Sequence, residues 1–79
     1  MKTFYKKAEL LTFSFSKMAE KLMNKKFHVT TVNKEFIAIV TNIIPSQPDN
    51  LPFSITFELE DIKKITITLP NIEIMDTLD

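Results

Sequence analysis

The chain has 79 residues, and its ten basic and ten acidic side chains give a formal net charge of zero. This length, near the lower limit for a self-sufficient hydrophobic core, predicts one small domain over residues 1–79 that oligomerisation would help to stabilise. Without cysteine it can form neither disulfides nor a thiolate metal site. Without glycine it lacks the flexible loops that bind phosphate or present a catalytic serine, and without arginine its only strong cation is lysine.

The sequence also gives expectations about location. No apolar run approaches the roughly 18 to 20 residues that span a bilayer. The first residues, from Met1 to Lys7, lack the apolar core of a signal peptide. We therefore expect a cytoplasmic protein that does not enter a membrane. The abundance of Lys, Ile, Asn, Phe and Thr is typical of AT-rich coding sequences and indicates a low-GC bacterium or one of its mobile elements.

Residues 1–25 are expected to form a helical N-terminal segment. Apolar residues recur there at the spacing of an amphipathic helix, namely at Phe4, Ala8, Leu11, Phe15, Met18 and Leu22. The helix is predicted over about residues 16–24, with Ser14 or Ser16 as a possible cap. Residues 11–16 also alternate like a strand, so the part over residues 3–15 can be read as helix or as strand.

The remainder is expected to form about five short antiparallel strands. The first, over residues 27–32, is followed by a two-residue hairpin loop at Asn33-Lys34. The next, over residues 35–44, is apolar in both phases of a two-residue repeat between residues 36 and 40, so we expect it to be covered on both faces. The later strands, over residues 54–60, 65–69 and 72–75, alternate more cleanly and are expected to be half buried.

Residues 45–52 contain three of the four prolines and predict a loop, because proline lacks a backbone donor. A helix followed by such strands indicates a mainly β (α+β) fold. With one strand covered on both faces, the prediction is a small SH3-like or Sm-like barrel over residues 27–75.

Two stretches carry a family resemblance. Leu22-Met23-Asn24-Lys25-Lys26-Phe27-His28-Val29-Thr30 looks like the helix-to-strand entry of Sm-like proteins, and Ile67-Thr68-Leu69-Pro70-Asn71-Ile72-Glu73-Ile74 is similar to their closing strand pair. The ending Leu69-Pro70-Asn71-Ile72-Glu73-Ile74-Met75-Asp76 also resembles YolD-like proteins of low-GC bacteria. The first resemblance implies binding of single-stranded nucleic acid, and the second implies a protein partner in the DNA-damage response.

No catalytic constellation is visible in the sequence. His28 is the only histidine and has no cluster of ligands or nucleophile near it in the chain. Glu58, Glu60 and Asp61 could bind a metal, but we favour the solvated side of a strand that enters a charged turn. We therefore expect neither an enzyme nor a cofactor.

Two surfaces are candidates for binding. Aromatic and other apolar residues of the N-terminal segment suit a protein partner or self-association, and they are Phe4, Tyr5, Leu11, Phe13, Phe15 and Met18. Lysines suit a nucleic acid instead, and they are Lys17, Lys21, Lys25 and Lys26. We rank first a small regulatory or adaptor protein that forms homo-oligomers and acts through protein contacts. A Sm-like protein that binds single-stranded RNA or DNA is the alternative.

Overall fold

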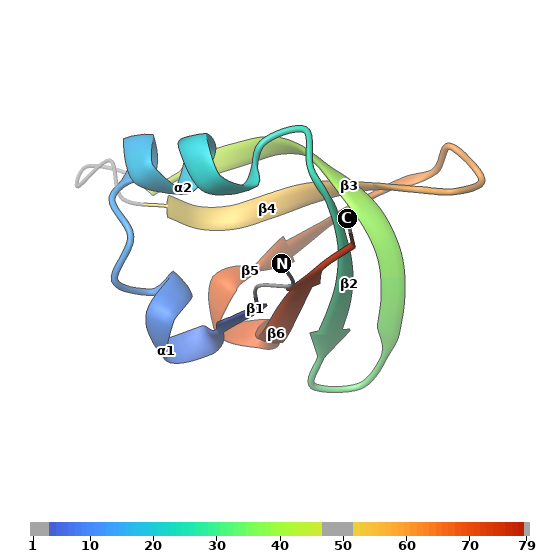
Figure 1. The fold of residues 1–79 in the computed structure, drawn as a ribbon, viewed down its shortest axis with the longest axis horizontal. Helices are drawn as coiled ribbons and strands as arrows, with labels where there is room; N and C mark the ends of the chain where they lie inside the picture. Colours follow the sequence, from blue (N-terminus) through green and yellow to red (C-terminus); the bar gives the residue numbers. More distant parts are fainter. Residues whose placement is uncertain (1–3, 47–51, 79) are drawn as a thin grey trace.

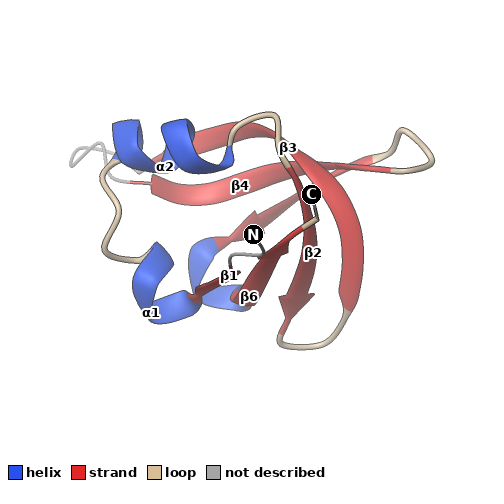
Figure 2. Cartoon of the chain, in the orientation of Figure 1, coloured by secondary structure: helices blue, strands red, loops and turns tan. Residues whose placement is uncertain are grey.

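The computed structural model describes residues 4–46 and 52–78. Along the chain lie β1 (Phe4–Lys6), α1 (Lys7–Leu10), α2 (Phe15–Leu22), β2 (Lys26–Thr31), β3 (Glu35–Pro45), β4 (Pro52–Leu59), β5 (Lys64–Thr68), the 3-10 turn η1 (Leu69–Asn71) and β6 (Ile72–Thr77) (Figure 1). The prediction of a mainly β fold is confirmed. Figure 2 shows the two α-helices at the same end of the molecule, with the strands curving away from them.

All strands belong to one antiparallel sheet of 6 strands, in the order β1-β6-β2-β3-β4-β5. The last strand, β6, returns to pair with β2, and the short β1 adds to the free side of β6. β1 and β5 are the two edges of the sheet. The long β3 bends strongly, so that the sheet curls around its own apolar face (Figure 1).

The inner face of the sheet forms the core together with residues from both helices. Its fully or almost fully buried side chains are Leu10, Met18, Leu22, Phe27, Val29, Ala38, Val40, Ile43, Ile55, Phe57, Leu69, Ile72 and Met75. Met18 and Leu22 of α2 lie one turn apart on the same side of the helix, which is why this helix covers an open end of the curled sheet.

The single helix expected over residues 1–25 is not confirmed. β1 occupies Phe4–Lys6 and pairs with β6, and α1 has only 4 residues. The chain leaves α1 through a turn in which the Thr12 hydroxyl donates to the Glu9 carbonyl oxygen at 2.7 Å. Ser14 then starts α2, because its Oγ accepts a hydrogen bond from the Lys17 backbone N–H at 3.2 Å. The predicted helix near residues 16–24 and the Ser14 cap are thus both found.

The prediction that β3 is covered on both faces is wrong. Ala38 and Val40 are buried, whereas Ile37 and Ile39 are each 37% exposed on the opposite face. Beyond Val40 the register with β4 shifts, because Val40 pairs with Phe57 and Asn42 with Thr56. This bulge reverses the alternation, so that Ile43 points inward in place of an even-numbered residue. Two features therefore make the strand apolar in both phases. The bulge moves the inward positions from even to odd numbers, and Ile37 and Ile39 are apolar although they face outward.

The loops also differ in detail from expectation. The hairpin loop between β2 and β3 contains Val32 as well as the predicted Asn33-Lys34, and Thr31 N–H donates to the Lys34 carbonyl oxygen across it at 2.8 Å. The β4–β5 hairpin closes where Leu59 N–H donates to the Lys63 carbonyl oxygen at 2.8 Å. Most of the predicted proline-rich loop, residues 47–51, lies outside the described residues.

Candidate functional site

The structure separates the apolar residues that the sequence offered as a partner surface. Met18 is completely buried. Tyr5 packs edge-on against Phe13 and Phe27, with ring centroids 5.8 and 6.3 Å apart, and it belongs with Phe13 and Phe15 to the side of the core. Only Phe4 and Leu11 are well exposed, at 51% and 54%. Most of the predicted residues therefore lie at the core, and Phe4 is the one that is exposed on a face of the sheet.

That surface is the outer sheet face, which we define by two rows of side chains that run across the strands. In the first row, Phe4 pairs with Asp76, Asp76 pairs with His28, and His28 pairs with Ile37. In the second row, Lys26 pairs with Ile39, Ile39 pairs with Glu58, and Glu58 pairs with Lys64. Residues paired in this way point to the same side of a sheet, opposite to the core. The two rows bring together residues from β1, β2, β3, β4, β5 and β6.

The outer sheet face exposes large apolar side chains. Phe4 is 51% exposed, and Ile37, Ile39 and Leu78 are each 37% exposed. Leu78 continues the second row, since its backbone N–H donates to the Lys26 carbonyl oxygen at 3.1 Å. Isolated exposed apolar residues are ordinary, but several on one face of a sheet make that face a candidate binding surface.

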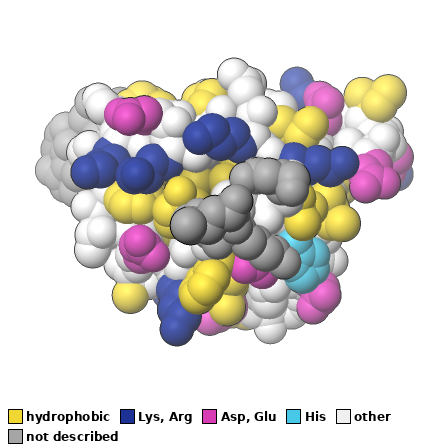
Figure 3. Space-filling model, viewed as in Figure 1, with side chains coloured by type: hydrophobic (Ala, Val, Ile, Leu, Met, Phe, Trp, Pro, Cys, Tyr) yellow, Lys and Arg dark blue, Asp and Glu magenta, His cyan; other side chains and the backbone are white. Residues whose placement is uncertain are grey.

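Charged groups surround the isoleucines. On the β2 side, the His28 ring lies between two carboxylates, with Nε2 3.2 Å from Glu35 Oε1 and Nδ1 3.9 Å from Asp76 Oδ2. Figure 3 shows this histidine beside hydrophobic and acidic side chains. On the β4 side lie the carboxylates of Glu58 and Glu60.

Two shallow hollows mark the outer sheet face beside the isoleucines. One, of about 500 Å³, has His28, Ile37 and Glu60 among its lining residues. The other, of about 240 Å³, has Lys26, Ile39 and Glu58 among its lining residues. The first hollow therefore extends from His28 on β2 to Glu60 just beyond β4, and the second extends from Lys26 on β2 to Glu58 on β4.

The four lysines of the nucleic-acid hypothesis lie on α2 and in the segment that follows it. Lys17 and Lys21 are four residues apart on the helix, and Lys25 and Lys26 lead into β2. Figure 3 shows lysine side chains spread over the region of α2. In the part of the chain that the structure describes, none of these lysines takes part in an ion pair.

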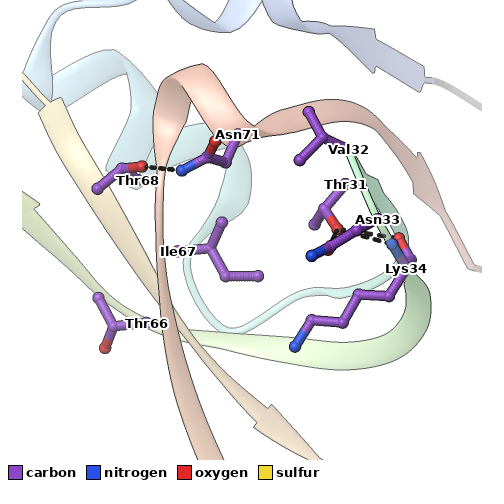
Figure 4. Close-up of a pocket in the computed structure, with 8 residues that line it drawn as sticks. All are labelled: Thr31, Val32, Asn33, Lys34, Thr66, Ile67, Thr68 and Asn71. Atoms are coloured by element: carbon purple, nitrogen blue, oxygen red, sulfur yellow. Dashed lines mark hydrogen bonds between the residues drawn. The ribbon is translucent and has the colours of Figure 1, made fainter.

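A separate pocket lies where the curled sheet brings distant segments together. Its volume is about 360 Å³, and it is lined by Thr31, Val32, Asn33, Lys34, Thr66, Ile67, Thr68 and Asn71 (Figure 4). Its polar groups largely bond to one another: Thr31 Oγ1 donates to the Lys34 carbonyl oxygen at 3.0 Å, and Asn71 Nδ2 donates to Thr68 Oγ1 at 2.6 Å. Sequence reasoning did not find this pocket, because its two sides come from segments more than 30 residues apart.

Within residues 4–46 and 52–78, no group of three or more His, Asp or Glu side chains is placed to hold a metal ion. Asp61 bonds its own turn, accepting from the Lys63 backbone N–H at 3.3 Å, while Glu58 lies opposite Lys64. None of the described helices is long and apolar enough to cross a membrane.

No family model, curated protein or solved structure matches this chain.

Proposed function

We propose that the protein is a small non-enzymatic regulatory or adaptor module that binds other proteins through its outer sheet face. The observation that carries this proposal is the exposure of Phe4, Ile37, Ile39 and Leu78 on one face of the sheet, between charged side chains of both signs. An apolar centre with a polar rim is the usual composition of a protein interface.

We propose further that the fold is a small barrel of the SH3-like or Sm-like kind, and that the chain is related to YolD-like proteins. The pairing of β6 with β2 supports this architecture, because it returns the end of the chain to the first of the five long strands and curls the sheet. In this proposal β1 is an addition that protects the outer edge of β6.

The experiment is a pull-down from a low-GC bacterial extract, with nuclease treatment of half the sample. Three bait proteins are compared. They are the parent chain, the variant Ile39→Asp, which changes the outer sheet face, and the control variant Glu20→Gln, on the exposed side of α2. We expect partner proteins that survive nuclease treatment, remain with Glu20→Gln and disappear with Ile39→Asp. Capture that disappears with nuclease, or that is unchanged in Ile39→Asp, would contradict the proposal.

A second candidate function is binding of single-stranded RNA or DNA, and the lysines of α2 and the segment after it favour it. Lysine contacts with phosphate make affinity fall with rising salt, and removing contacts reduces the slope. If this function holds, replacement of Lys17, Lys21 and Lys25 by glutamine should weaken binding to a single-stranded oligonucleotide and flatten its salt dependence. We expect little binding by the parent chain near physiological salt, and micromolar binding that the triple variant loses would reverse this ranking.

A further inference from the structure

We infer that the outer sheet face binds a second copy of this chain, in a dimer whose two-fold axis runs along β3. The inference rests on the proposed function, because it takes the same face as the binding surface and names its partner. Its basis is the order Lys26, Ile39, Glu58 along one row, which makes that row complementary to its own two-fold copy.

Charges of both signs lie on each side of β3, because Asp76 lies beside His28 and Lys64 pairs with Glu58. The positions directly beside the isoleucines are nevertheless ordered. Lys26 and His28 lie on β2, at one side of β3, while Glu58 and Glu60 lie on or just beyond β4, at the other side. Lys26 and Glu58 stand in one row with Ile39 between them, two strand spacings or about 10 Å apart. This distance is too great for a direct ion pair within one chain, and among the described residues the structure forms none between them.

A rotation of 180° about an axis parallel to β3 turns a second copy over onto the first. The rotation keeps each row at its height along β3 and exchanges the β2 side with the β4 side. Lys26 of each copy then lies opposite Glu58 of the other, and His28 lies opposite Glu60. The isoleucines of the two copies meet at the axis. The contact is isologous, so every favourable pair occurs twice.

The alternatives for this face fit the charges less well. A nucleic acid would meet the carboxylates of Glu35, Glu58, Glu60 and Asp76 around the apolar centre, and these would repel its phosphates. A row that carries Lys26 on one side of Ile39 and Glu58 on the other favours a partner with the opposite arrangement, which a two-fold copy of the face supplies.

Charge reversal tests the pairing directly, with dissociation constants from sedimentation equilibrium. Lys26→Glu alone places two pairs of facing carboxylates in the dimer, and Glu58→Lys alone places two pairs of facing ammonium groups. Each variant should therefore dimerise at least about tenfold more weakly than the parent chain.

Mixing the two variants restores the opposite charges. In the heterodimer, the glutamate introduced by Lys26→Glu in one copy faces the lysine introduced by Glu58→Lys in the other. The native Glu58 of the first copy faces the native Lys26 of the second. The mixture should therefore recover dimers that neither variant forms alone.

Two further variants make the test specific. Ile39→Asp, at the axis, is present twice in the dimer and should weaken it by about a hundredfold. The double variant Lys17→Glu with Glu20→Lys, on the exposed side of α2, should dimerise like the parent chain. Circular dichroism of each variant shows whether it is folded.

Each outcome either supports or overturns the dimer. A parent chain that stays monomeric at millimolar concentration, a dimer that survives Ile39→Asp, or a mixture that fails to recover dimers overturns the inference. The proposed function fails separately: if the chain is monomeric but Ile39→Asp still abolishes the nuclease-resistant capture, the face binds another protein and only the self-association is refuted.

Discussion

Neighbouring residues of β3 should respond very differently to the same substitution. Val40 has no exposed surface and belongs to the apolar core, whereas Ile39 is 37% exposed. Val40→Asp loses about 2 kcal/mol of apolar burial and leaves a buried carboxyl group without a partner, which costs about 1–3 kcal/mol more. A domain of this size is stable by only about 4–12 kcal/mol. We therefore expect Val40→Asp to be largely unfolded or to lose at least about 3 kcal/mol.

Ile39→Asp should lose only about 1–2 kcal/mol, from partial burial and from the weaker strand preference of aspartate. Thr66→Asp, on the exposed face of β5, is the control and should stay within about 1 kcal/mol of the parent chain. Urea denaturation followed by circular dichroism, at a concentration where the chain is monomeric, gives the three free energies. Equal losses for Ile39→Asp and Val40→Asp would refute the inward and outward assignment of this strand.

Three further pairs of substitutions test the local structure by urea denaturation. Ile62, which is 76% exposed, adopts a positive φ of 71°. Ile62→Gly should therefore stabilise the protein by about 1 kcal/mol, whereas Asn24→Gly, at a φ of 64°, should change stability little. A loss of stability in Ile62→Gly would contradict the strained turn. Ser14→Ala should cost about 1 kcal/mol through loss of the cap, and Ser14→Asp should retain most of it; equal losses would argue against capping. Met18→Ala should cost about 2–5 kcal/mol, while Leu11→Ala, at an exposed position, should stay within about 0.5 kcal/mol; the reverse order would contradict the packing of α2.

The strands of the fold could be read from the sequence because their apolar alternation is local. Residues predicted as strands at 27–32, 65–69 and 72–75 correspond to β2, β5 and β6 with ends that differ by only one or two residues. The helix α2 was also predictable, since its buried residues recur at helical spacing and a serine caps its start.

The errors fall where distant contacts decide the structure. β1 has 3 residues, too few for any periodicity, and it is a strand because β6 offers it an edge. The apolar spacing that favoured one long helix joins residues in different surroundings. Phe4 and Leu11 are exposed, whereas Met18 and Leu22 of α2 are buried. The bulge after Val40 depends on pairing with β4, so the sequence of β3 alone could not reveal which isoleucines face outward.

The candidate surface was only partly predictable. Phe4 and Lys26 were named from composition and spacing, but no local pattern links them to Ile37, Ile39 or Glu58. The link is the register across several strands, which a single sequence does not display.

The most direct test of self-association through the outer sheet face is a map of backbone amide chemical shifts by NMR, recorded while the protein is diluted from millimolar to micromolar concentration. We expect concentration-dependent shifts that cluster at Lys26, His28, Ile37, Ile39 and Glu58, with little change along α2. Shifts that cluster on α2 or on the free edge of β5, or no shifts at all over this range, would contradict it.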